Sequence, residues 1–448
     1  MGHIDRHSQE TPRAETSEPR DSTASRLGLL EIWLGPAMRS SIGIETPLYA
    51  VSDPAVRCIL SLGAALLGYG LPAHRVEESV LRLARAFGHS ATVFGLPTAL
   101  IITLRGPTGT EMHVVRAEPG TIDLARLDAL HRVVAHVEQQ RLDGSTAEQE
   151  VSTILRAGAA LPRSADLFAA ALVGFGGNLM IGGRVDEAAW SAALAVIVGS
   201  LMGLGVRRPA LARVLPLAAA VAATLAASGL SHLGIIAHPL VVAFAAQFLL
   251  LPGLMLTLAM TELATGHLVS GTARSMGAGV VFLQLGLGGL LGARLGNLAQ
   301  SSPGLLSPPS FAPAATGALM LATGFLFLFR VHRSDVVQTY ATAALAFLVC
   351  RFVGAWQGAE IGVLIAAFVV MLYGHAFARR RDRPSSTLTL PGVSMLVPGS
   401  LGLMSVSAAA LSDPTRAFAT GFQLLMVLIA LSSGILFAAA VLPPRTGM

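Results

Sequence analysis

One acidic residue, Glu262, lies inside the apolar stretch FLLLPGLMLTLAMTELATGHLVSGTAR (residues 248–274), and the chain contains no Lys to balance it. A charged carboxylate that faced lipid would cost at least about 2.5 kcal/mol, so we expect Glu262 to face a cavity, to pair or to be protonated. A poorly hydrated carboxyl group can exchange protons near neutral pH, which is the chemistry of proton coupling. We expect Arg274 to be its partner. The alternative is that Glu262 only caps or hydrates a loop end, because Thr265-Gly266-His267 follow at once.

A Pro-Gly pair, Pro252 and Gly253, interrupts the same apolar stretch and recurs 146 residues later as Pro398 and Gly399. A break of this kind is tolerated at membrane depth only where it is buried in protein or lines a wet cavity. Each break would leave a half-helix N-terminus with about half a positive charge, which suits a carboxylate ligand. Two ordinary proline kinks are the alternative. The matched positions favour a central polar cavity with a substrate site at the two breaks.

Other polar side chains lie within the apolar runs, and each alone is more often an interhelical hydrogen bond than a ligand contact. They are Asn178, Gln247, Ser270, Gln284, Arg351 and Gln423. We place Ser270, Gln284 and Asn178 in the predicted substrate site, although the glycines around Asn178 also suit close helix packing. Arg351 can instead form a structural salt bridge with Glu360.

Composition identifies the class of protein. Of the 448 residues 53% are hydrophobic and 13% are charged, and the mean hydropathy is +0.64, which indicates a membrane protein. The two cysteines support neither a disulfide framework nor a zinc site. The arginines flank apolar runs and form no basic groove, which argues against nucleic-acid binding. We expect no metal and no cofactor, and the absence of HExxH, GxSxG and paired intramembrane Asp argues against an enzyme.

Ten apolar runs follow residue 164, most of them close to the length of about 20 residues that a membrane requires. They lie near 165–182, 188–205, 212–229, 234–264, 267–294, 311–329, 335–354, 358–377, 388–411 and 415–441. The offset of 146 residues also takes Arg184 to Arg330 and Gly288 to Gly434, which indicates a duplication. Because each copy would have five spans, an odd number, the second copy would have the opposite orientation in the membrane.

The predicted fold is therefore mainly α: a polytopic membrane protein of ten transmembrane helices as two inverted five-helix repeats, with a small N-terminal cytoplasmic α+β domain. In that domain we expect a helix in LPAHRVEESVLRLARAFGH, a β-hairpin in TALIITLRGPTGTEMHVVRA and two further amphipathic helices. The predicted parts are a disordered tail (1–52), the α+β domain (53–163), the first repeat (164–296), an external connector (297–310) and the second repeat (311–443).

Loop charges predict the orientation. With a cytoplasmic N-terminus, the external side receives only Arg184, Arg294 and Arg416, which satisfies the positive-inside rule. The cytoplasmic side receives ten arginines: Arg207, Arg208, Arg213, Arg330, Arg333, Arg379, Arg380, Arg381, Arg383 and Arg445. The tail has no apolar segment of the kind found in signal peptides.

In order along the chain, GYGLPAHRVEESVLRLARAFG, FGLPTALIIT, LLPG, TELATG, SGTAR and LVPG together resemble the threonine/serine exporter (ThrE) family, over residues about 55 to 441. The resemblance implies a ten-span transporter of the bacterial cytoplasmic (inner) membrane that exports threonine and serine with the proton motive force. The matching residues are Arg75, Glu77, Pro252, Gly253, Glu262, Ser270, Gly271, Arg274, Pro398 and Gly399. Arg75 and Glu77 are expected to dock the soluble domain to the bundle, or simply to face solvent.

The predicted function is proton-coupled export of small hydrophilic amino acids, with threonine or serine, protons and membrane lipid as partners; a homo-oligomer is compatible with the sequence. A small-dicarboxylate exporter, for example of succinate, is the alternative if Arg274 and Arg351 both line the cavity. From other classes, a membrane-anchored sensor and a membrane enzyme stay open.

Overall fold

The computed structural model describes residues 51–106, 109–117, 120, 122–157, 161–298, 309–381, 385–397, 401 and 414–443, which belong to one compact unit that begins at Ser40. The described chain is mainly helical with one small sheet, as the sequence predicted. Several predicted features lie outside the described residues. They are Pro398, Gly399, most of the predicted tail and connector, Arg383 and Arg445.

The first part of the chain forms helices packed on an antiparallel sheet of order β1-β2-β3. Its elements are α2 (Pro54–Gly68), α3 (Ala73–Ala86), β1 (Ser90–Leu96), β2 (Ala99–Gly106), β3 (Gly109–Arg116), α4 (Leu124–Glu138) and α5 (Gly144–Arg156). The predicted helix, hairpin and two later helices are present, and α2 and β1 are additions. Helix α3 forms because Val76, Val80 and Leu83 recur at helical spacing and are all fully buried.

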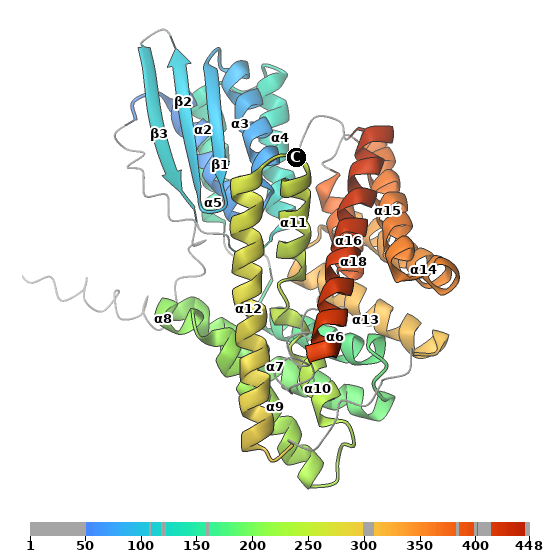
Figure 1. Cartoon of the computed structure of the whole chain (residues 1–448). Coiled ribbons are helices and arrows are strands. Elements are labelled where there is room, and N and C mark those ends of the chain that lie inside the picture. Colours follow the sequence, from blue (N-terminus) through green and yellow to red (C-terminus); the bar gives the residue numbers. More distant parts are fainter. Residues whose placement is uncertain are drawn as a thin grey trace, which may run out of the picture. The chain divides into compact units, whose positions relative to one another are not determined.

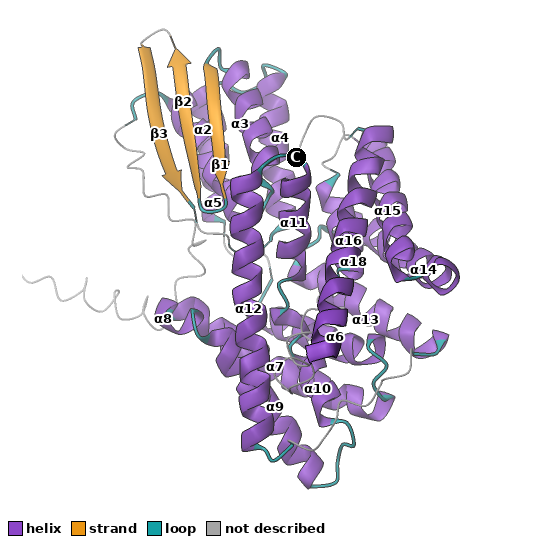
Figure 2. Ribbon diagram, in the orientation of Figure 1, coloured by secondary structure: helices purple, strands orange, loops and turns teal. Residues whose placement is uncertain are grey.

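Helix α2 is the centre of this domain's core. Ile59, Leu62 and Leu66 are fully buried, and Figure 2 shows the helices gathered on one side of the sheet. Gly63 permits the close approach, since a Cβ there would lie 3.0 Å from the Leu100 side chain of β2 and 3.1 Å from that of Val80. The sheet and the helices therefore share one apolar core.

The rest of the described chain is helical (Figure 1). The first group is α6 (Arg163–Met180), α7 (Val185–Arg207), α8 (Pro209–Ala212), α9 (Leu215–His232), α10 (Pro239–Ala246), η2 (Phe248–Leu250), α11 (Gly253–Ala264) and α12 (Leu268–Leu295). The second is α13 (Phe311–Leu328), η3 (Arg333–Asp335), α14 (Val336–Gln357), α15 (Ala359–Arg381), α16 (Ser386–Leu396) and α18 (Pro414–Val441).

Among the described residues, seven helices are long and apolar enough to cross a membrane, and eight if the bent pair α10 and α11 counts as one span. The chain is therefore a multi-pass membrane protein. Two of the ten predicted runs are not in that set. The run 165–182 coincides with α6, and 388–411 coincides with α16 and residues beyond the described part.

Matching features recur at the offset of 146 residues. Helices α12 and α18 each have 28 residues and begin at residues 268 and 414. The residue before each Pro-Gly pair has the same extended backbone, with φ −65° and ψ 123° at Leu251 and φ −67° and ψ 123° at Val397. Such agreement is what a duplication would produce, and inversion of the second copy stays a prediction.

Small residues allow the long helices to pack closely. A Cβ at Gly288 of α12 would lie 2.5 Å from the Leu217 carbonyl oxygen and 2.7 Å from Ala220 of α9. A Cβ at Gly434 of α18 would likewise meet the Leu364 carbonyl of α15. These contacts leave no room for a methyl group.

We expect Gly288→Ala to destabilise the protein by about 1–3 kcal/mol, because the added methyl group would push α12 away from α9. Gly289→Ala is the matched control, since a Cβ there meets nothing within 4 Å. Thermal unfolding of both variants in detergent would compare them. Equal midpoints for the two variants would contradict this account of the packing.

Candidate functional site

The helical run that contains Pro252 is interrupted, as the Pro-Gly pair predicts. Segments Pro239–Ala246 and Phe248–Ala264 are bent by 43°, and α11 begins at Gly253 with Pro252 as its N-cap. Within the described residues, no side-chain hydrogen bond caps this N-terminus. The first N–H groups of α11 are therefore not bonded by a capping side chain, and together with the helix dipole they favour an anion.

The interruption lies deep among the helices. The ring of Phe248 packs against Gly177 of α6, where an added Cβ would lie 2.9 Å from it. Leu249 lies against Gly199, close to the middle of α7. These contacts place the break about halfway along a helix that is long enough to span a membrane.

Gln247, at the end of α10, is fully buried at this break. Its Nε2 donates to the Ala243 carbonyl oxygen at 3.1 Å, whereas its Oε1 has no hydrogen-bond partner in the described part of the chain. A carbonyl can only accept, so the amide must turn its nitrogen toward Ala243 and leave its oxygen free. A buried acceptor of this kind needs a donor, from water or from a ligand. The sequence marked Gln247 only as a polar residue within a span.

Glu262 lies in a buried cluster with Ser270 and Arg274. The Glu262 side chain is fully buried, and its Oε2 lies 3.0 Å from Nε of Arg274, which is 4% exposed. Ser270 Oγ donates to Oε2 at 2.9 Å. The backbone N–H of Ala73 donates to Oε1 at 2.9 Å. Because Ala73 is the first residue of α3, the carboxylate also lies at the positive end of that helix dipole.

This cluster attaches the N-terminal domain to the hairpin of α11 and α12. Arg274 Nη2 donates to the Leu71 carbonyl oxygen at 3.3 Å. His267 Nε2 lies 3.6 Å from Glu77 Oε2, while Glu77 Oε1 accepts the N–H of Gly95 at 2.7 Å. Of the two residues predicted to dock the domain, Glu77 thus contacts the membrane part. Arg75 pairs instead with Glu78 of its own helix, at 3.2 Å.

A pair of histidine rings lies beside this attachment. The rings of His74 and His267 are 5.5 Å apart. Burial lowers the pKa of His74 to about 4, with smaller effects from the charges of Arg75 and His267. His74 is therefore uncharged at neutral pH.

A second attachment joins the domain to the end of α13. The N–H of Leu124 donates to the Phe329 carbonyl oxygen at 2.9 Å, and Arg330 Nη1 lies 3.5 Å from Asp123 Oδ2. Both charged side chains are buried. Arg330 has φ 49°, an uncommon value for a residue other than Gly. The sequence identified Arg330 as a loop charge and as the counterpart of Arg184 in the repeat, but it could not predict the contact with Asp123, which lies far away in the chain.

The remaining predicted ligands have separate partners. Asn178 Nδ2 donates to Ser191 Oγ at 2.9 Å, and Gln284 Nε2 donates to the Arg213 carbonyl oxygen at 3.2 Å. Ser270 donates its hydrogen bond to Glu262. Glu262 follows Gly253 by nine residues in α11, which corresponds to about 13 Å along the helix at 1.5 Å per residue. The structure therefore joins Glu262, Ser270 and Arg274 at the attachment of the domain, and gives Asn178 and Gln284 neighbours of their own.

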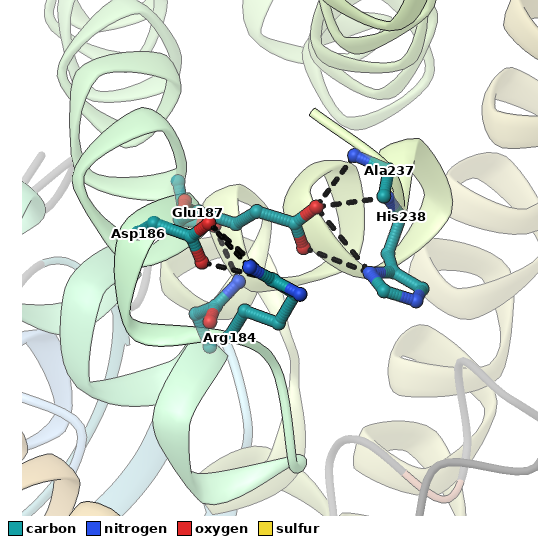
Figure 3. A network of polar contacts seen from close by, with 7 residues as sticks. Arg184, Asp186, Glu187, Ala237 and His238 are labelled. Atoms are coloured by element: carbon teal, nitrogen blue, oxygen red, sulfur yellow. Dashed lines mark hydrogen bonds and ion pairs between the residues drawn. The ribbon is translucent and has the colours of Figure 1, made fainter. Parts of the chain in front are cut away.

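At the other end of the interrupted span, a network that the sequence analysis missed surrounds Glu187 (Figure 3). Glu187 Oε1 accepts the N–H groups of Ala237 and His238, at 2.6 and 3.0 Å, and Oε2 lies 3.2 Å from Nδ1 of His238. Arg184 pairs with Asp186 at 2.8 Å. An open depression of about 650 Å³ is lined by Arg184, Val185 and Asp186. Glu187 directly precedes the expected span 188–205, so the sequence carried only a weak signal for it.

Within the described residues, no group of His, Cys, Asp and Glu side chains could hold a metal ion.

In the comparison with known proteins, both halves of the chain match family models. A family model described as "Putative threonine/serine exporter" matches residues 57–296, and one described as "Threonine/Serine exporter, ThrE" matches residues 314–441. No solved structure matches the chain.

Similar curated proteins are membrane proteins of yeasts. Pheromone-regulated membrane protein 10 of Saccharomyces cerevisiae (strain YJM789) is 24% identical over 86% of this chain and 53% of its own length. The proteins of the same name from Eremothecium gossypii and Yarrowia lipolytica are 24% and 23% identical, over 88% and 80% of this chain and 57% and 31% of their own lengths. The chain thus spans only part of these relatives. Because the first family model alone covers more than half of its residues, the chain belongs to the threonine/serine exporter family.

Proposed function

We propose that the chain is a secondary active exporter of small hydrophilic amino acids, such as threonine and serine, and that the proton motive force drives it across a bacterial cytoplasmic membrane. Membership of the family supports transport of a small molecule. The observation that carries the proposal is the interrupted span, because an uncapped helix N-terminus and a free buried acceptor lie about halfway along α7. An amino acid presents the two complementary groups, a carboxylate and an ammonium.

In this proposal the chain crosses the membrane ten times as two inverted repeats. The offset of 146 residues between α12 and α18, and between Leu251 and Val397, supports the duplication. The N-terminal domain is cytoplasmic. In support, the domain binds the chain near Glu262 and at Arg330, positions that the loop charges assign to the cytoplasmic side.

The substrate carboxylate binds at the N-terminus of α11, after Pro252 and Gly253, and Pro398 and Gly399 supply the matching break of the second repeat. The free Oε1 of Gln247 accepts a hydrogen bond from the substrate ammonium. Ser270 and Gln284 have protein partners in the structure, and they are assigned to contacts between helices. Asn178 Nδ2 donates to Ser191, whereas its buried Oδ1 has no hydrogen-bond partner among the described residues, so Asn178 stays a proposed ligand of the substrate.

Glu262 exchanges the proton, with Arg274 as its counter-ion. Arg274, Ser270 and the N–H of Ala73 all stabilise the charged carboxylate. Protonation of Glu262 would weaken each of these contacts, so proton uptake and release of α3 favour one another. The docking of the domain thereby becomes part of the transport cycle, because any ligand that prefers one state shifts the population toward it.

Export of dicarboxylates receives less support. It would need Arg274 and Arg351 to be available to two carboxylates. Arg274 is instead paired with Glu262, and Arg351 Nη2 donates to the Pro309 carbonyl oxygen at 2.8 Å.

Purified protein in proteoliposomes should move labelled threonine when a pH gradient is imposed. Unlabelled serine should compete, because it shares the amino and carboxyl groups, and succinate should not. Competition by succinate but not by serine would overturn the assignment to amino acids.

Gln247→Leu should raise KM for threonine by about tenfold or more, since a hydrogen bond to a charged group contributes about 1.5–3 kcal/mol. Initial rates of counterflow would measure this effect. Gln284→Leu is the control, because Gln284 is bonded to Arg213 away from the break. An unchanged KM in Gln247→Leu would exclude Gln247 from the substrate site.

Glu262→Gln should abolish gradient-driven threonine movement and leave counterflow, because Gln can still accept the N–H of Ala73 but cannot exchange a proton. Glu78→Gln is the control, since Glu78 pairs within α3. Both activities can be read in the same proteoliposomes. Unchanged driven transport in Glu262→Gln would remove Glu262 from the mechanism.

A further inference from the structure

We propose that His238, held by Glu187, is the proton-binding residue on the side of the membrane opposite the N-terminal domain. The inference rests on the proposed proton-coupled export and adds the site at which the proton enters. The contacts of Glu187 and His238, and their place at one end of the interrupted span, carry it (Figure 3).

Glu187 is a buried carboxylate whose titratable partner is an imidazole. Its side chain is 3% exposed and lies in the first turn of α7. It accepts the backbone N–H groups of Ala237 and His238 and also contacts Nδ1 of His238. The guanidinium of Arg184 forms its direct ion pair with Asp186, and its charge acts on Glu187 only as a weaker electrostatic effect. Of the side chains that contact Glu187 in the described chain, His238 is the one that can bind a further proton and become positively charged.

The contact fixes which nitrogen receives the proton. An ionised carboxylate only accepts hydrogen bonds, so Nδ1 of His238 must carry its hydrogen toward Glu187. In the neutral ring Nε2 is then the free base, and Figure 3 shows this nitrogen on the side of the ring away from Glu187. The side chain is 45% exposed, which gives water access to it. A proton from the aqueous phase binds Nε2 and forms an imidazolium, and its release restores the neutral ring.

Protonation acts on the interrupted span itself. Helix α10 begins at Pro239, directly after His238, and Glu187 binds the two N–H groups that precede this helix. The imidazolium strengthens the attraction to Glu187 and holds the start of α10 against α7. Loss of the proton weakens that hold. His238 and Glu262 therefore lie at opposite ends of one span, where a proton that drives export would enter and leave.

No other charged group near α10 matches this arrangement in the described residues. The elements that neighbour α10 carry the following titratable residues toward its N-terminal end: Arg184, Asp186 and Glu187 on α7 and its N-cap, His232 on α9, and Arg294 on α12. The part of α6 near Asn178 has no titratable side chain. His232 contacts the Gly296 carbonyl oxygen at 2.8 Å instead of a carboxylate. His232 is thus a matched control on the same side of the molecule.

The test compares His238→Gln, His232→Gln and Glu187→Gln with wild-type protein in proteoliposomes. His238→Gln should lose gradient-driven threonine flux and keep threonine counterflow, whereas His232→Gln should keep both. Glu187→Gln still accepts the backbone N–H groups of Ala237 and His238 but removes the charge, so it should shift the dependence of flux on pH toward lower pH. Wild-type response to the gradient in His238→Gln would overturn the proposal. Wild-type protein that moves no threonine at all would instead count against the proposed function.

A second measurement needs no substrate. Amide hydrogen exchange over residues 237–246, corrected for its intrinsic dependence on pH, should show more protection on acidification in wild-type protein. His238→Gln should show no such change. Equal pH dependence of protection in the two proteins would overturn the proposal even if the substrate is misassigned.

Discussion

A backbone polar group inside a membrane must find a partner within the protein, and the interruption before Pro252 is where this constraint applies most strongly. Proline has no N–H, Leu251 has an extended backbone, and no side chain in the described part of the chain caps the helix that follows. The surrounding structure compensates by holding both ends of the interrupted span. Glu187 binds the N–H groups before α10, and Glu262, near the end of α11, binds the N–H of Ala73. A buried carboxylate therefore lies at each end of the interrupted span.

The N-terminal domain is bound to the membrane part at two places that belong to different halves of the chain. One is the cluster of Glu262, Ser270 and Arg274, and the other is the pairing of Arg330 with Asp123. A buried ion pair is weak evidence for stability, because desolvation offsets much of the attraction. It does specify geometry, since removal of one partner leaves a charge without compensation. The two attachments therefore give the domain contacts with both halves of the chain.

Much of this arrangement follows from the sequence, and the limits have physical causes. The Pro-Gly pair predicts a break because proline removes a hydrogen bond, and the cost of an isolated acid predicts a partner for Glu262. Periodicity predicts α3, and alternation predicts the hairpin of β2 and β3. The partner Ala73 could not be predicted, because a backbone N–H has no signature and lies 189 residues from Glu262. Glu187 and His238 were missed for a related reason. Each is unremarkable alone, and only the fold brings them together.

The contact between Ala73 and Glu262 also affects how an experiment that removes the N-terminal domain can be interpreted. Without residues 71–77, Arg274 would lose the carbonyl of Leu71 and Glu262 would lose its helix terminus, and water would reach both side chains. The ion pair would then be screened by solvent. Truncation would therefore change the electrostatic environment of Glu262 and Arg274 in the membrane part, in addition to removing the domain.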